Sequence, residues 1–252
     1  MKLLVSAIIL LSAQAFGGYV FPDDFQICGK DDANLDECIL NAIRDAWPKL
    51  AEGISSPIDI KTEPVFSPYC EYHPKNDVFN FDEYFWNLSH TGFDNSQILD
   101  AHVDVATLSL NFTTFSPHVV QKSVYAASGV VLYNKTRDPD IIWGSGPVVK
   151  ELYNTTILHQ IRSVQYEQDG KSYLRVDSYN VSVSLDFITF DYQNLYNGTR
   201  PDLAKRTGEY INANAPYITA NQQPYVETFL AGMFKEYAKA IIGSVSIDEL
   251  IH

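Results

Sequence analysis

The side chains with the clearest potential for chemistry in this sequence are a histidine and an aspartate two residues apart, His102 and Asp104. In an extended strand this spacing places both on one face, where they could bind a metal ion or transfer a proton. An isolated pair is more often a surface or structural feature, because such sites need further ligands. Gly144-Ser145-Gly146 is too short for the Gly-x-Ser-x-Gly turn of serine hydrolases. We therefore expect no enzyme activity, no metal site and no cofactor.

Three cysteines and six Asn-x-Ser/Thr sequons indicate an oxidising, extracellular environment. Cys28 and Cys38 are expected to form a disulfide, because ten residues apart they can close a small loop before a helix. Cys70 is then left over, and it is either buried or free to link two chains in a dimer. The predicted glycosylation sites are Asn87, Asn111, Asn134, Asn154, Asn180 and Asn197.

The N-terminus has the form of a secretory signal peptide over residues 1–15. Lys2 precedes an apolar run from Leu3 to Leu11, and Ala13-Gln14-Ala15 is typical of a cleavage site. The apolar run is shorter than the roughly 20 residues that a membrane-spanning helix needs. We expect a protein that is secreted into an extracellular fluid without stable membrane insertion.

Charge and composition narrow the classes of partner. The net charge is −13, with 46% hydrophobic and 13% aromatic residues among 252. An acidic surface repels phosphate backbones, so no nucleic-acid partner is expected. The apolar content is enough for a sizeable core, in one large domain or two small ones.

Helical and strand patterns occupy different parts of the chain. Apolar residues at helical spacing from Leu35 to Leu50 predict an amphipathic helix, with Asn34 as its N-cap and Gly53 at its end. Four prolines predict an extended or irregular connection over residues 54–75. From about residue 78 to 192 the period is two, which predicts an antiparallel meander with a hairpin turn at Asp169-Gly170. Several sequons fall out of phase with the apolar positions, so one side of the sheet should be dry and the other should carry sugars.

From about residue 198 to Gly243 the pattern is helical again. Pro216 and Pro224 should kink or break this segment. A straight helix of that length would span roughly 65 Å, so the helix must be bent, or the sheet must wrap along an elongated molecule. Such a sheet either packs solidly against the helix or leaves a lined cavity.

Several short motifs, taken in order, resemble the insect haemolymph juvenile hormone-binding protein and takeout family over nearly the whole mature chain. They are Trp47-Pro48-Lys49-Leu50, Glu63-Pro64-Val65, Phe85-Trp86-Asn87-Leu88, Gly144-Ser145-Gly146, Leu195-Tyr196-Asn197-Gly198 and Asp248-Glu249-Leu250. The resemblance implies one ligand-binding domain over residues 16–252. It also implies an α+β, TULIP-like fold in which a curved antiparallel sheet wraps a long C-terminal helix and encloses an elongated hydrophobic tunnel.

In that family the tunnel carries terpenoids such as juvenile hormone, or fatty-acid-like molecules, and no enzyme activity is characteristic. Juvenile hormone-binding proteins proper carry a second disulfide, whose cysteines are missing here, so the chain is more similar to takeout. The candidate tunnel-lining residues are Tyr225, Phe229, Met233 and Tyr237 on the helix, and Trp86, Leu110 and Phe112 on the opposite wall. For each, an ordinary core position is the alternative.

Three hypotheses follow. The first is a secreted carrier of a small hydrophobic ligand. The second is an extracellular interaction or structural protein of the same fold with a filled tunnel. The third is an enzyme, which would need convergent polar side chains in the cavity.

Overall fold

The computed structural model describes residues 25–54, 60–73, 75, 79–131, 140–243 and 246–251. The predicted signal peptide and the sequon at Asn134 lie outside these ranges. The elements in chain order are α1 (Leu35–Glu52), β1 (Val65–Tyr72), β2 (Phe79–Thr91), β3 (Gln97–Asp104), β4 (Ser109–Val131), β5 (Asp140–Gln168), β6 (Lys171–Ser184), β7 (Phe187–Tyr192), a 3₁₀ turn (Tyr196–Gly198), α2 (Pro201–Ala213), α3 (Ala215–Ile242) and α4 (Ile247–Leu250).

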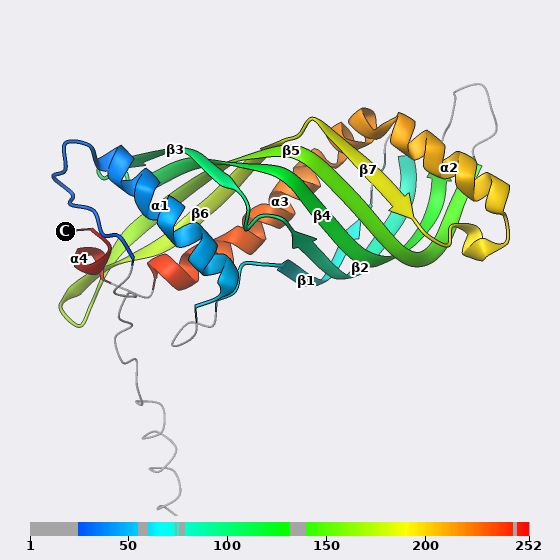
Figure 1. Ribbon diagram of the computed structural model, residues 1–252. Helices are drawn as coiled ribbons and strands as arrows, with labels where there is room; N and C mark the ends of the chain where they lie inside the picture. Colours follow the sequence, from blue (N-terminus) through cyan, green and yellow to red (C-terminus); the bar gives the residue numbers. More distant parts are fainter. Residues whose placement is uncertain are drawn as a thin grey trace, which may run out of the picture.

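The strands form one antiparallel sheet in the order β1-β2-β4-β5-β6, with β3 added beside β4 and β7 beside β5. β4 and β5 are 23 and 29 residues long and pair with each other, and each also pairs with two further strands along its length. The sheet is therefore long, and it curls along α3 (Figure 1). This arrangement confirms the predicted α+β fold, a curved antiparallel sheet with a long C-terminal helix.

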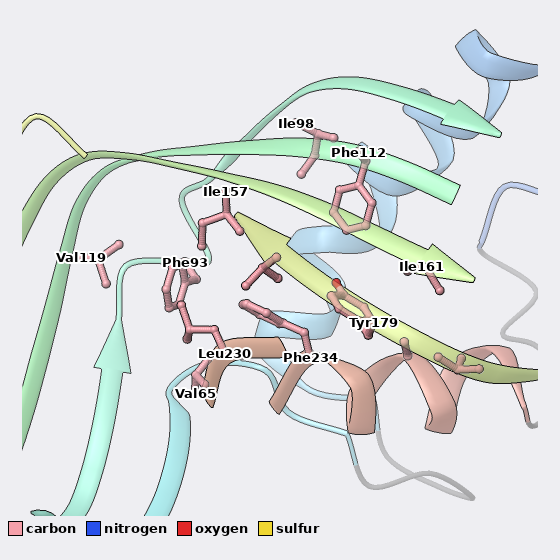
Figure 2. Close-up of a cluster of buried hydrophobic side chains, with 13 residues drawn as sticks. Val65, Phe93, Ile98, Phe112, Val119, Ile157, Ile161, Tyr179, Leu230 and Phe234 are labelled. Atoms are coloured by element: carbon pink, nitrogen blue, oxygen red, sulfur yellow. The ribbon is translucent and has the colours of Figure 1, made fainter. Parts of the chain in front are cut away.

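The helices cover the sheet at different places. α3 packs against β6 and β7, α1 against β3, and α2 against β7. A large apolar cluster fills the space where α1, the sheet and the C-terminal half of α3 meet, and Figure 2 shows Phe93, Leu230 and Phe234 within it. A second cluster lies around Tyr125, Phe190 and the start of α3. The interior is thus two cores in a row along one helix.

Local signals for α1 and for the hairpin are confirmed. Asn34 occupies the N-cap position of α1, although its side chain makes no capping hydrogen bond there. Gly53 ends the helix with φ of 105°, which favours glycine. Asp169 and Gly170 form the turn between β5 and β6, both with positive φ.

The connection predicted to be extended or irregular over residues 54–75 contains a paired strand, β1, in its second half. β1 includes Pro68 and lies at one end of the strand order, paired with β2. Proline lacks the N–H that a central strand would need, but an edge strand can leave that position unpaired. The prolines that argued against regular structure are therefore compatible with an edge strand.

The C-terminal helical segment is broken near Pro216, as predicted, but it continues through Pro224. α2 ends at Ala213 and α3 begins at Ala215, with Pro216 in the first turn of α3, where a missing N–H costs nothing. Pro224 lies inside α3. The predicted helical segment is therefore two helices preceded by a short 3₁₀ turn, and α3 is the one that contacts both apolar clusters.

Candidate ligand-binding cavities

Three cavities lie in a row between the sheet and α3. We call them the α1 cavity, the central cavity and the β7 cavity. Their volumes are about 190, 410 and 50 Å³. Phe93 lines both the α1 cavity and the central cavity, and Gln222 lines both the central cavity and the β7 cavity. The interior therefore contains a segmented channel, interrupted at these two side chains.

The α1 cavity is almost wholly apolar. Its lining side chains come from α1, β4, β5, β6 and α3, and they include Trp47, Leu50, Ile161, Tyr179, Ala238 and Ile242. The indole nitrogen of Trp47 donates a hydrogen bond to the Phe93 carbonyl oxygen at 2.7 Å. Because this polar group is already satisfied, the cavity offers a ligand mainly apolar contact.

Three of the seven predicted lining residues, Leu110, Phe112 and Tyr237, line the α1 cavity. Phe229 and Met233 are half-buried and pack against the same apolar cluster, but they are not among the residues that line the three cavities. Their spacing on α3 is helical, but they pack against other side chains of the cluster and do not face a void.

Trp86 and Tyr225 lie elsewhere, and the prediction that they line the interior was wrong. Trp86 is 40% exposed and stacks on Tyr84 on the outer face. A β-bulge between Trp86 and Ser89, with Asn87 at φ 52°, breaks the strict alternation that would have placed Trp86 beside Leu88. Tyr225 is 52% exposed and packs edge-on against Tyr72.

The central cavity carries the polar groups that the sequence reasoning missed. His90, Gln121 and Lys150 lie abreast on β2, β4 and β5, because His90 pairs with Gln121 and Gln121 with Lys150. All three side chains line this cavity, together with Thr155. The sequence did contain a signal for Lys150. It lies two residues from both Val148 and Leu152, so it shares their inward face of the strand.

Two opposite charges are buried near the boundary between the central cavity and the β7 cavity. Lys150 is 7% exposed, and its Nζ lies 4.4 Å from the Phe85 ring centroid. Glu83 lines the β7 cavity and accepts a hydrogen bond from the Tyr192 hydroxyl at 2.7 Å. Burial raises the pKa of Glu83 and lowers the pKa of Lys150, and the charge of each opposes the other's shift.

A second buried polar group, His159, belongs to the core beside the α1 cavity. Its ring stacks on Phe112 with centroids 4.4 Å apart. Its nitrogens lie 3.1 Å from the Thr114 hydroxyl and 2.9 Å from the Tyr179 hydroxyl. Burial lowers the pKa of His159 to about 3, so the ring is neutral at physiological pH. Burial likewise lowers the pKa of His90 to about 4.

His102 and Asp104, the pair with potential for metal binding or proton transfer, lie on the surface. His102 Nδ1 is 2.8 Å from an Asp36 carboxylate oxygen of α1, which raises the pKa of His102. Asp104 accepts hydrogen bonds from the backbone N–H groups of Ala106 and Thr107. Within the part of the chain that the structure describes, no group of three His, Cys, Asp or Glu side chains could hold a metal ion. No helix among the described residues is long and apolar enough to cross a bilayer.

The disulfide between Cys28 and Cys38 is confirmed. Cys70 is a free, half-buried thiol whose pKa is raised by burial. Among the predicted glycosylation sites, four asparagines are exposed and Asn111 is half-buried. The exposed ones are Asn87, Asn154, Asn180 and Asn197.

A family model, a relative and a solved structure each match most of this chain. Residues 5–252 match the family model described as haemolymph juvenile hormone binding protein. A putative beta-carotene-binding protein of Schistocerca gregaria is 23% identical over 214 residues, covering 83% of this chain and 80% of that protein. The crystal structure of Epiphyas postvittana Takeout 1 superposes with a TM-score of 0.75 at 18% identity, covering 90% of this chain and 99% of that one.

Proposed function

Because the chain belongs to the haemolymph juvenile hormone binding protein family, we propose that it is a carrier that binds a small hydrophobic ligand in the cavities along α3. The observation that carries this proposal is the row of cavities between sheet and helix, where a solid core would leave none. The ligand class is a terpenoid, a juvenile hormone-like molecule or a fatty-acid-like molecule. The beta-carotene named for the locust relative, a long apolar molecule, supports this class.

Apolar burial alone can supply useful affinity. A ligand that buries about 400 Å² gains roughly 10 kcal/mol at about 25 cal/mol per Å². Association costs several kcal/mol, which leaves micromolar or tighter binding. The lining of the α1 cavity needs no charged contact for this, so the proposed function is binding and transport without chemical conversion.

We further propose that residues 16–252 form one ligand-binding domain that is secreted. The disulfide supports an extracellular setting. Four of the sequons lie exposed, where a glycan could be attached without disturbing the core.

The alternative is an extracellular interaction protein of the same fold whose channel holds no ligand. The observation that favours it is the interruption of the channel at Phe93 and Gln222. A disulfide-linked dimer through Cys70 on non-reducing gels would support this alternative.

The proposed function is tested by filling the α1 cavity. In Ala238→Phe the new ring occupies space in the α1 cavity that a ligand would need, since Ala238 lines that cavity. We expect methyl palmitate to displace the fluorescent probe N-phenyl-1-naphthylamine from this variant with at least about tenfold weaker affinity than from the wild type. Because the cavity can absorb much of the added volume, the variant should stay folded.

The matched control is Ala213→Phe, an exposed position at the end of α2. This control should bind methyl palmitate like the wild type. Equal affinities of all three proteins for methyl palmitate would contradict binding in the α1 cavity.

A further inference from the structure

Lys150 is a buried cation that lines the central cavity, and its ammonium makes no direct contact with an anionic side chain of the described residues. Among the described residues, no hydrogen bond or ion pair engages its Nζ. The ammonium group lies over three aromatic rings, 4.4 Å from the Phe85 centroid, 5.6 Å from Phe190 and 6.0 Å from Tyr192. These rings attract a cation through their faces, but they do not replace hydrogen-bond acceptors.

Glu83 does not neutralise Lys150 directly. One oxygen of Glu83 accepts the hydrogen bond from Tyr192, and the residue lines the β7 cavity. The other oxygen has no hydrogen-bond partner in the described part of the chain, so it does not accept one from Lys150. Burying an unpaired cation is costly, and an anion entering the central cavity would offset that cost.

A second polar group faces the same cavity without a partner. Thr155 is 2% exposed and lines the central cavity, and its hydroxyl makes no hydrogen bond within the described ranges. Thr155 and Lys150 both belong to β5, and Gln121 lies opposite Lys150 on β4. Lys150 and Gln121 are therefore neighbours across the two strands, whereas Thr155 lies five residues further along β5, roughly 16 Å away at about 3.3 Å per residue. The lining of the central cavity also includes Leu152, Ile157 and Leu230.

We propose that the central cavity binds the carboxylate of a long-chain organic acid, paired with the Lys150 ammonium beside the Gln121 amide. The acyl chain extends past Phe93 into the α1 cavity, which is lined by apolar side chains. This inference rests on the proposed carrier function and adds the chemical class of the ligand's polar end. A carboxylate fits because it accepts several hydrogen bonds and carries the negative charge that would neutralise the Lys150 ammonium.

The test compares two ligands that differ only at the polar end, palmitic acid and methyl palmitate. Displacement of N-phenyl-1-naphthylamine is measured for the wild type and for Lys150→Met, which keeps the length of the side chain and removes its charge. We expect the wild type to prefer the acid, and the variant to bind the acid at least about tenfold more weakly while its affinity for the ester stays within about threefold. Lys122→Met, an exposed position on β4, is the control and should behave like the wild type.

Other outcomes separate this inference from the carrier function. If the wild type binds both ligands and Lys150→Met changes neither affinity, the head-group site is overturned and the carrier function stands. If neither ligand displaces the probe from the wild type, the carrier function fails as well. Should Lys150→Met fail to fold, Lys150→Gln replaces it, because the amide keeps a polar group at this position and removes the charge, and a selective loss of at least about threefold for the acid is expected. Equal loss for acid and ester in Lys150→Gln would also overturn the head-group site.

Discussion

At the scale of single residues, inward-facing ionisable side chains distinguish this interior from a plain apolar core. His159 lies among aromatic rings beside the α1 cavity, and His90 lies on the wall of the central cavity. Both rings are held neutral by burial, which lowers the pKa of each well below 6.5. These two histidines therefore lower the free energy of unfolding as the pH falls, because the unfolded chain takes up protons that the folded chain does not accept.

His159 predicts a loss of stability on acidification. The unfolded histidine binds a proton near pH 6.5, whereas the folded one does so only near pH 3. Between these values the unfolded state binds more protons, so His159 alone should lower the free energy of unfolding by about 1.4 kcal/mol per pH unit as the pH falls. In urea unfolding from pH 7 to pH 5, His159→Phe should show a shallower pH dependence than the wild type.

The comparison of slopes is needed because buried acids act in the opposite sense. The raised pKa of Glu83 means that the folded protein binds that proton more readily than the unfolded chain. His102 also has a raised pKa, so its contribution is present at low pH and is lost as the pH rises through the folded value. His102→Gln should therefore make the loss on acidification steeper, and equal slopes for all three proteins would refute the assignment of His159.

At the scale of elements, the sequence predicted those whose signals are local. The helix beginning after Asn34 and the hairpin at Asp169-Gly170 follow from periodicity and turn chemistry within a few residues. The strand β1 was missed because Pro68 argues against a strand until its edge position is known. Trp86 was misplaced because the bulge after it depends on pairing with β4. The residues of β2 alone do not reveal this pairing.

The disulfide joins the N-terminal segment to α1, and it also concerns the C-terminus. The backbone of Cys28 forms a parallel β-bridge with Ile251, which follows α4. The disulfide to Cys38 of α1 therefore holds both ends of the described chain close to α1. Closing a loop of about 11 residues should contribute about 3 kcal/mol by restricting the unfolded chain. We expect the double variant Cys28→Ser, Cys38→Ser to lose roughly this amount of unfolding free energy in chemical denaturation.

Cys70→Ser provides the comparison, because Cys70 is a free thiol. This variant should lose much less unfolding free energy than the double variant. A double variant as stable as Cys70→Ser would show that the crosslink does not restrict the unfolded chain as assumed.

At the scale of the whole molecule, the family resemblance predicted a curled sheet along α3 with a tunnel between them, but the pattern of residues alone left open whether the interior contains voids. Periodicity identifies which faces are apolar, whereas a cavity depends on the sizes of side chains that meet from α1, the sheet and α3. Leu110, Phe112 and Tyr237 were correctly placed at one cavity, and Lys150 and Thr155 at another were missed. A charged residue at an inward-facing strand position, such as Lys150, indicates a polar site in the interior, and it is overlooked when only the apolar positions are considered.

The central claim is that the channel along α3 shelters a hydrophobic ligand. The most direct measurement is mass spectrometry of an organic extract from the full-length protein, purified from the cells that express it and from their medium. The account predicts a stoichiometric apolar ligand with a long hydrocarbon or terpenoid part, depleted in extracts of Ala238→Phe produced in the same way. Extracts of the wild-type protein that contain no lipid above the background of Ala238→Phe would contradict it.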